Sequence, residues 1–146
     1  GGDGMVGPSI IDALGEDIEG FVTTLPGSES EGGTRFVEIA AEAGIESGGV
    51  FIPESYDAAA LIALAMQKAG STERAAVAAA VSEVANAPGE PILPGEIAKA
   101  IGILADGGEV DYVGATDVEL DEAGETDGSY KEQEVRDGKY VVIGYR

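Results

Sequence analysis

Two side chains, Asp3 and Tyr56, have the residue types and the flanking sequence of a small-molecule binding site. Asp3 lies in the Gly1–Gly4 turn, whose pattern is that of a strand end bending into a helix, and ligands of open α/β sheets bind at that edge. A carboxylate there can hold an ammonium group through charge-assisted hydrogen bonds. An ordinary turn aspartate explains the same residue, because Asp and Gly dominate turns.

Tyr56 follows Pro53-Glu54-Ser55 at the start of an apolar helical pattern. A phenol can pack on the aliphatic part of a ligand and offer its hydroxyl, and the exposed N–H groups of a first helical turn can meet a carboxylate. A core tyrosine with a satisfied hydroxyl is the alternative. The residues alone leave both interpretations open.

The residue types that the chain lacks exclude most catalytic chemistry. Its 146 residues include no His and no Cys, which removes the commonest general base, the commonest metal ligand and the thiol nucleophile. Ser–His and Cys–His nucleophile pairs are therefore impossible. A hydrolase that uses only carboxylates stays open as a remote alternative. We expect a protein that is not an enzyme and that uses no cofactor.

The acidic run over 121–127 matches a calcium loop only in part. Counted from Asp121, an EF-hand loop needs a ligand at its third position and a glycine at its sixth, where the sequence has Ala123 and Thr126. Glu132 does fall at the twelfth position. We expect an acidic hairpin turn here and no metal site. The Gly-rich stretch over 47–49 precedes no Gly-Lys-Ser/Thr, so no nucleotide site is expected either.

The chain is strongly acidic, with 28 Asp and Glu against 8 Lys and Arg and a net charge of −20. Nucleic acid and anionic membranes would repel it, so neither is an expected partner. The charge suits a salty exterior, where counterions screen self-repulsion, although a generic solubilising surface explains it equally well. No apolar run approaches the roughly 20 residues that span a bilayer. The opening over 1–7 has no signal segment and reads like the middle of a domain, so we expect a piece of a longer protein.

Hydrophobic periodicity and turn residues predict an α/β protein with an irregular, hairpin-like end. We expect helices over 10–14, 34–43, 54–69, 72–85 and 95–105, a buried strand over 19–25, an extended piece over 50–53, and short strands over 110–113, 118–120, 129–135 and 140–145. The stretches over 27–33 and 86–94 are expected to be loops. Turns over 121–124 and 136–139 indicate hairpins.

Several segments, in the same order along almost the whole chain, resemble the leucine/isoleucine/valine-binding family, the type I periplasmic binding proteins of ABC transporters. They are Gly-Asp-Gly-Met at 2–5, Leu-Gly-Glu-Asp-Ile-Glu-Gly at 14–20, Tyr-Asp-Ala-Ala at 56–59, Ala-Met-Gln-Lys-Ala-Gly at 65–70, Asp-Tyr-Val-Gly-Ala at 111–115, the turn at 121–124 and Val-Arg-Asp-Gly-Lys-Tyr at 135–140. The resemblance implies part of a two-lobed fold of three-layer αβα elements, ending in a C-terminal β-hairpin.

The resemblance also implies which portion this is. Residues 1–26 would end the second lobe, residues 27–108 would supply the helices and connecting strand of the first lobe after a crossover, and residues 109–146 would form the return crossover and the hairpin. By position, Asp3 resembles the family's acidic residue that binds the α-ammonium of the ligand, and Tyr56 resembles an aromatic wall residue. Asp3 is one methylene shorter than the Glu of the amino-acid binders.

The implied function is the capture of a branched-chain or other small aliphatic amino acid, in the periplasm or outside the cell, for uptake by an ABC permease. The alternative is the same fold used as a ligand-sensing receptor or an amide-responsive regulator. Unpaired sheet edges of a partial fold also predict a homodimer that forms by edge pairing.

Overall fold

The computed structural model describes residues 1–27 and 29–146. The chain forms two compact units: unit 1 comprises residues 1–29 and 128–146, and unit 2 comprises residues 30–127. Each unit is described by itself. The predicted loop over 27–33 includes Ser28, which lies outside the described residues. Within the described part of the chain, no helix has the length and apolar character needed to cross a membrane.

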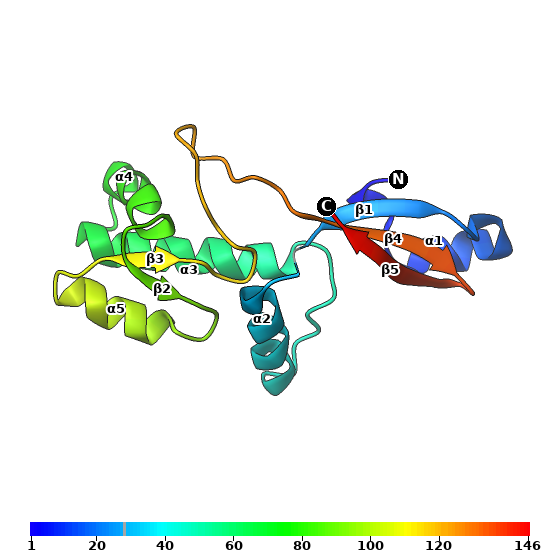
Figure 1. Cartoon of the computed structure of the whole chain (residues 1–146), viewed down its shortest axis with the longest axis horizontal. Coiled ribbons are helices and arrows are strands. Elements are labelled where there is room, and N and C mark those ends of the chain that lie inside the picture. The colour runs from blue at the N-terminus through cyan, green and yellow to red at the C-terminus, as the bar shows by residue number, and fades with distance from the viewer. Residues whose placement is uncertain (28) are drawn as a thin grey trace. The chain divides into compact units, whose positions relative to one another are not determined.

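Unit 1 contains a three-stranded antiparallel sheet preceded by short helices. The sheet has the strand order β1-β4-β5 (Figure 1). Its elements, in chain order, are the 3-10 helix η1 (Asp3–Met5), α1 (Pro8–Leu14), the 3-10 helix η2 (Gly15–Ile18), β1 (Val22–Pro26), β4 (Tyr130–Arg136) and β5 (Lys139–Tyr145). The strand predicted over 19–25 begins only at Val22, because η2 and a turn occupy the residues before it.

The β4–β5 hairpin confirms the turn predicted over 136–139. Asp137 has φ 52° and Gly138 has φ 69°, the left-handed conformation that two-residue hairpin turns need and that Asp-Gly adopts readily. The Glu19 carboxylate accepts hydrogen bonds from the backbone N–H of Asp137 at 2.8 Å and from that of Gly138 at 3.4 Å. Glu19 therefore fastens the turn of the hairpin to the segment before β1.

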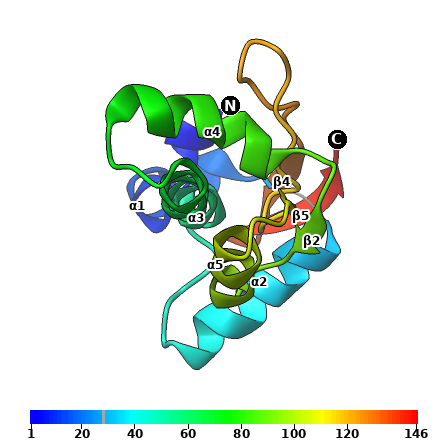
Figure 2. The same cartoon turned by 90° about the vertical axis from the view of Figure 1, so that its left-hand side faces the viewer.

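Unit 2 contains four helices and a two-stranded parallel sheet. Its elements are α2 (Glu31–Glu42), α3 (Ile52–Ala69), α4 (Arg74–Ala85), β2 (Glu90–Ile92), α5 (Ile97–Ala105) and β3 (Val110–Tyr112). Strands β2 and β3 pair in parallel, and α5 is the crossover between them. Seen end-on, α3 lies between α4 and α5 (Figure 2). The main core joins these helices to both strands through Leu64, Val84, Ile92, Leu104, Val110 and their buried neighbours.

Two helices of unit 2 begin earlier than the sequence predicts. Helix α2 begins at Glu31, inside the predicted loop, because the Ser30 hydroxyl caps it by accepting a hydrogen bond from the Gly33 N–H at 3.0 Å. Helix α3 begins at Ile52, so the extended piece predicted over 50–53 is wrong. Phe51 precedes α3 in the left-handed conformation, and Pro53 occupies the first turn, where a helix needs no N–H donor.

Two strand assignments also need correction. The predicted loop over 86–94 contains β2, an edge strand that tolerates Pro91 although proline lacks a ladder donor. The strand predicted over 118–120 does not form, because Asp117 takes φ 55° and breaks the extended chain. Leu120 makes one isolated bridge to Thr126, across the turn predicted over 121–124.

The Asn86 side chain supplies the hydrogen bonds that a strand would otherwise give to Leu120. Its Nδ2 donates to the Leu120 carbonyl at 2.6 Å, and its Oδ1 accepts from the Leu120 N–H at 2.9 Å. We expect Asn86→Ala to lower the free energy of unfolding by about 1–2 kcal/mol, because both backbone groups of Leu120 lose partners. Asn86→Asp, which keeps the acceptor but sets a carboxylate oxygen against the Leu120 carbonyl oxygen, should lose more. Urea unfolding of the three proteins measures this order, and equal stabilities would contradict it.

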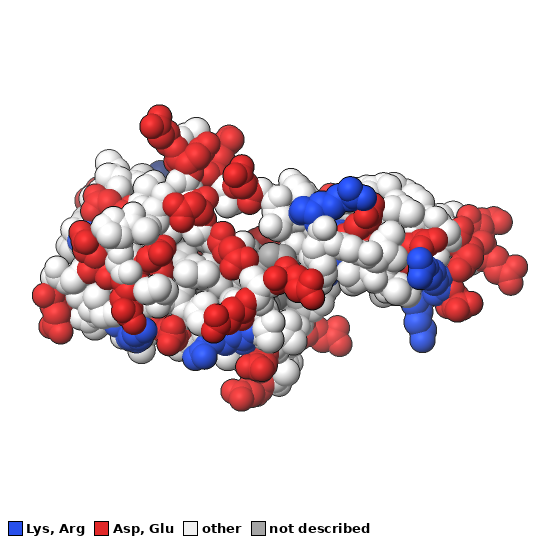
Figure 3. Space-filling view, in the orientation of Figure 1, with Lys and Arg blue, Asp and Glu red and all other residues white. Residues whose placement is uncertain are grey.

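The surface of both units is acidic. Red carboxylate side chains are spread over the face shown in Figure 3, and blue cations are few. Several cations lie in ion pairs, such as Lys99 with Glu90 at 2.8 Å and Arg146 with Glu132 at 3.2 Å. Because acids outnumber bases by 28 to 8, most carboxylates have no cation available to pair with.

Candidate functional site

Asp3, the predicted ammonium-binding residue, begins η1 in unit 1 and is half-buried. The short turn around it is held to the sheet from two directions. The Thr23 hydroxyl donates to the Gly2 carbonyl at 3.1 Å, and the Tyr140 hydroxyl donates to the Met5 carbonyl at 2.8 Å. Among the described residues, no donor contacts the Asp3 carboxylate. The fold therefore presents a fixed backbone turn with an uncommitted carboxylate.

Tyr56, the predicted wall residue, lies in the first turns of α3 in unit 2 and is half-buried. Its ring packs against Phe36 of α2, with the ring centroids 5.2 Å apart and the planes tilted by 50°. Its hydroxyl accepts a hydrogen bond from the Gly95 N–H at 2.9 Å. Phe36, Ala40 and Ala115 form a second small core that Tyr56 joins. The hydroxyl hydrogen of Tyr56 has no acceptor within the described part of the chain.

Asp3 and Tyr56 belong to different units, and the structure describes each within its own unit. It brings Asp3 together with Gly2, Thr23 and the segment that Tyr140 holds. It brings Tyr56 together with Phe36, Ala115 and Gly95. Their common role in one ligand site stays a prediction.

Asp57, next to Tyr56, is a buried charged residue that the sequence analysis did not single out. Its side chain is only 3% exposed. One oxygen, Oδ1, accepts from the Tyr112 hydroxyl and from the Ala115 N–H, both at 2.8 Å. The other, Oδ2, accepts from the Thr116 N–H at 2.9 Å and from the Thr116 hydroxyl at 2.7 Å. The carboxylate therefore joins α3 to the end of β3 and to the loop that follows it.

The environment of Asp57 opposes its ionisation. Burial raises the pKa of the Asp57 carboxyl above its ordinary value, and the hydrogen bonds from Ala115, Thr116 and Tyr112 oppose that rise only in part. The pKa of the Tyr112 hydroxyl is also raised, first by burial and then by the neighbouring Asp57 carboxylate.

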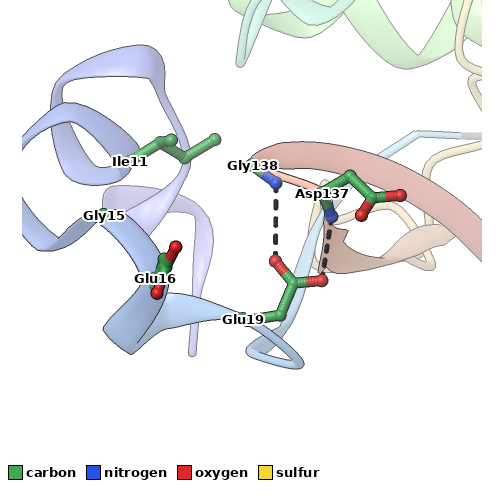
Figure 4. Close-up of a pocket in the computed structure, with 6 residues that line it drawn as sticks. All are labelled: Ile11, Gly15, Glu16, Glu19, Asp137 and Gly138. Atoms are coloured by element: carbon green, nitrogen blue, oxygen red, sulfur yellow. Dashed lines mark hydrogen bonds between the residues drawn. The ribbon is translucent and has the colours of Figure 1, made fainter.

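A pocket of about 680 Å³ lies in unit 1 between the C-terminal end of α1 and the tip of the hairpin. Ile11 projects toward Gly138 on one side of it, and Glu16 and Glu19 lie on its acidic side; Asp137 also lines it, with its carboxylate directed away (Figure 4). The Glu19 carboxylate accepts hydrogen bonds from the N–H groups of Asp137 and Gly138 in the hairpin turn (Figure 4). The pocket therefore has an apolar side and an acidic side. On the acidic side, the Glu19 carboxylate already binds the backbone of the hairpin turn.

In the acidic loop over 121–127, the first carboxylate, that of Asp121, binds backbone N–H groups of the loop itself. Asp121 Oδ1 accepts from the Ala123 N–H at 2.8 Å and from the Glu125 N–H at 2.9 Å, which closes the turn. Among residues 1–27 and 29–146, no group of His, Cys, Asp or Glu side chains is arranged to hold a metal ion. The hydrogen bonds of Asp121 confirm the predicted acidic turn.

Comparison with known proteins relates the fold to solved structures. No protein-family model and no curated protein matches the sequence. The leucine-binding protein LivK of Thermotoga maritima matches with a TM-score of 0.66 and 22% identity, over 99% of this chain and 35% of that one. A proposed branched-chain amino acid ABC transporter from Rhodospirillum rubrum matches with a TM-score of 0.54 and 20% identity, over 98% of this chain and 36% of that one.

These matches confirm the fold class. The chain has an α/β fold that corresponds to part of a type I periplasmic binding protein, and it spans about a third of the length of the two solved proteins. The division of residues 1–26, 27–108 and 109–146 between two lobes stays a prediction. The two units found here divide the chain instead at residues 29 and 128.

Proposed function

We propose that this chain is part of a solute-binding protein that captures a branched-chain or other small aliphatic amino acid for uptake by an ABC permease. The observation that carries the proposal is the fold match over 99% of the chain to a leucine-binding protein. The second solved structure, whose description is a branched-chain amino acid ABC transporter, supports the same class of ligand. In this proposal the chain acts by reversible binding and is not an enzyme.

Asp3 is the proposed contact for the ammonium group of the ligand. Its carboxylate accepts no hydrogen bond from the described residues, whereas the backbone on both sides of it is fixed by Thr23 and Tyr140. A carboxylate on a rigid turn loses little conformational entropy when it binds, so most of its charge-assisted hydrogen-bond energy remains available for a cationic group.

Tyr56 is the proposed wall for the aliphatic part of the ligand. Its ring is fixed by contact with Phe36, and its hydroxyl accepts from Gly95 while keeping its own hydrogen to donate. Binding would follow the hinge-closure scheme, in which contacts from two lobes favour the closed state. Such a site needs polar contacts with a zwitterion and an apolar wall, and it needs none of the His or Cys chemistry that the chain lacks.

The proposed setting is the periplasm or the exterior of the cell, with the permease as the macromolecular partner. A net charge of −20 is tolerated best where the ionic strength is high. Self-association is a further proposal. The edge strand β5 exposes Val141, Val142, Ile143 and Tyr145, and sedimentation velocity of the chain measures whether these edges pair.

A thermal-shift screen of the full-length protein that contains this chain tests the proposed function. Amino acids, small carboxylates and aliphatic amides are the ligands to compare. We expect leucine, isoleucine or valine to raise the melting temperature in a concentration-dependent way, because a ligand that binds only the folded state stabilises it. A rise with amides alone would favour the amide-responsive regulator. The absence of a shift with every amino acid would refute the proposal.

Asp3→Ala tests the role of the carboxylate in the same full-length protein. We expect the amino-acid affinity to fall by about 2 kcal/mol or more, roughly 30-fold in Kd, because the ammonium group would be buried without its partner. Calorimetry measures the change. Asp17→Ala, which removes an exposed carboxylate from the same unit, is the matched control and should keep the affinity. An unchanged affinity in Asp3→Ala would remove Asp3 from the site.

A further inference from the structure

We propose that Asp57 is a positioning residue of the candidate site: by holding the loop after β3 against the first turns of α3, it fixes Phe36 and, through the contact of the two rings, Tyr56, the proposed wall of the site. This inference rests on the proposed ligand-binding role of Tyr56. Asp57 itself would not touch the ligand, because its two oxygens are already occupied by donors from Tyr112, Ala115 and Thr116.

The loop after β3 passes directly beside the Asp57 carboxylate. Gly114 has φ 64° and lies so close to Asp57 that a Cβ there would overlap the Asp57 carboxylate and the Tyr112 ring. The backbone can approach the carboxylate only because residue 114 has no side chain. The next two residues, Ala115 and Thr116, then point their N–H groups at Asp57. The carboxylate therefore determines the path of this loop.

The loop after β3 also contacts the first turn of α2. A Cβ on Gly32 would collide with the carbonyl oxygen of Gly114, so the first turn of α2 rests directly on the loop that Asp57 holds. Ala115 is 2% exposed and packs in the same small core as Phe36. A shift of the loop would therefore move α2 and, with it, the Phe36 ring.

Tyr56 is held by α2 and by the loop that contains Gly95. Its ring contacts Phe36 of α2, and its hydroxyl accepts from Gly95 in the loop between β2 and α5. Arg35 of α2 ties the same loop by donating from Nε to the Pro94 carbonyl at 2.7 Å. The orientation of Tyr56 thus depends on α2 and on the loop around Gly95, and α2 depends on Asp57. Tyr56 and Asp57 are also neighbours on one helix, so a change in the first turns of α3 affects both.

Asp57→Asn is the sharpest test, because it keeps the shape of the side chain and turns one acceptor into a donor. The new amide would face the N–H groups of Ala115 and Thr116, which donate already, or the Tyr112 hydroxyl. Asp106→Asn is the matched control: it makes the same charge change at an exposed position of unit 2 that accepts no side-chain hydrogen bond in the described structure. Thr116→Val, which removes one donor and leaves the carboxylate in place, is a milder variant should Asp57→Asn fail to fold.

Two measurements in the full-length protein decide the proposal. The first is the nuclear Overhauser contact between the Phe36 and Tyr56 rings, with the methyl signals of Leu64 and Val84 reporting whether the main core is intact. The second is amino-acid affinity by calorimetry. For Asp57→Asn we expect the ring contact to weaken with the core signals unchanged, and the affinity to fall roughly 3- to 30-fold, the range for residues that act on a site without touching its ligand. Thr116→Val should change both measurements less, and Asp106→Asn should change neither.

The results separate this inference from the proposed function. An unchanged ring contact in Asp57→Asn overturns the positioning role. So does a lost ring contact with unchanged affinity, because Tyr56 orientation would then be irrelevant to binding. If the wild-type protein binds no amino acid, the proposed function fails on its own, and the ring contact still decides whether Asp57 orients Tyr56.

Discussion

Replacing Asp57 with alanine should lower the free energy of unfolding by about 3–5 kcal/mol, the largest effect that we expect from any single substitution in this chain. The carboxylate is 3% exposed and accepts from four donors. Removing it leaves the N–H groups of Ala115 and Thr116 and the hydroxyl of Tyr112 without a partner; the Tyr112 and Ala115 donors are buried, and Thr116 is partly buried. Urea unfolding monitored by far-ultraviolet circular dichroism reports the loss.

The matched control for this prediction is Asp106→Ala, which removes an exposed carboxylate from the same unit. It should leave the stability nearly unchanged. The pH dependence gives a second signature. Burial raises the pKa of Asp57 in the folded chain above its unfolded value of 3.8. Between those two pKa values the folded state binds more protons, so the stabilisation due to this group falls as pH rises.

The difference in stability between wild type and Asp57→Ala should therefore shrink as the pH rises above 3.8, the unfolded value, until Asp57 is ionised in the folded chain as well. A difference that grows with pH would show a depressed pKa and would contradict the reading of burial as the dominant cause. A loss of less than about 1 kcal/mol in Asp57→Ala would show that water reaches the donors after all.

The elements predicted correctly from the sequence are those with strong local signals. The Asp137-Gly138 turn requires left-handed backbone at both positions and is found as a hairpin. The helix predicted over 54–69 is long and mostly apolar; it is found as Ile52–Ala69, and Gly70 ends it in the left-handed conformation. In both cases a few neighbouring residues determine the structure, so no distant contact is needed to predict it.

The start of α2 could not be predicted in this way, because two glycines stand in its first turn. Glycine disfavours a helix by its conformational freedom, and the stretch over 27–33 therefore reads as a loop. The structure shows why Gly32 is there: a side chain would collide with the Gly114 carbonyl oxygen, which is distant in the sequence. A residue chosen for a tertiary contact here contradicts the local propensity. Gly89 beside Val110 is a second example, at the start of β2.

Asp57 carried a signal that could have been read from the sequence. It stands three and seven residues before Ala60 and Leu64, which places it on the same helix face, and all three are buried. A carboxylate on the apolar face of a helix needs hydrogen-bond donors from elsewhere. The motif over 111–115 supplies two of them, although spacing alone does not show that Tyr112 and Ala115 reach the helix.

The two residues of the candidate site, Asp3 and Tyr56, could be predicted from the sequence to different extents. For Asp3 a turn was predicted from its glycine neighbours, and the structure adds the Thr23 and Tyr140 contacts that hold this turn. For Tyr56 the sequence left open a core role and a ligand role; the structure shows the core packing, and the ligand role stays a prediction. The ring packs in a small core, and the hydroxyl keeps a hydrogen that no described acceptor uses. A half-buried aromatic residue of this kind can serve as a rigid wall because the core holds it.

Raising the salt concentration should stabilise this chain, because salt screens the repulsion between its many carboxylates. The net charge is −20 on 146 residues, and most carboxylates have no cation to pair with. The Debye length falls from about 10 Å at 0.1 M salt to about 3 Å at 1 M, so repulsion between surface carboxylates weakens steeply over that range. We expect the free energy of unfolding to rise by about 2 kcal/mol or more from about 0.05 M to about 1 M NaCl.

Salt can stabilise the fold in two ways, by screening the repulsion between charges and by strengthening apolar burial. Only the screening effect depends on the number of surface charges. A variant with Glu38→Gln, Glu42→Gln, Glu46→Gln and Asp106→Asn neutralises four exposed acids that form no ion pair within the described residues. If screening dominates, this variant is more stable than wild type at low salt and gains less from NaCl. Sucrose, which strengthens burial without screening, should then stabilise both proteins alike. An equal gain from NaCl in the two proteins would instead assign the effect to apolar burial, and the acidic surface would have no part in the stability of the fold.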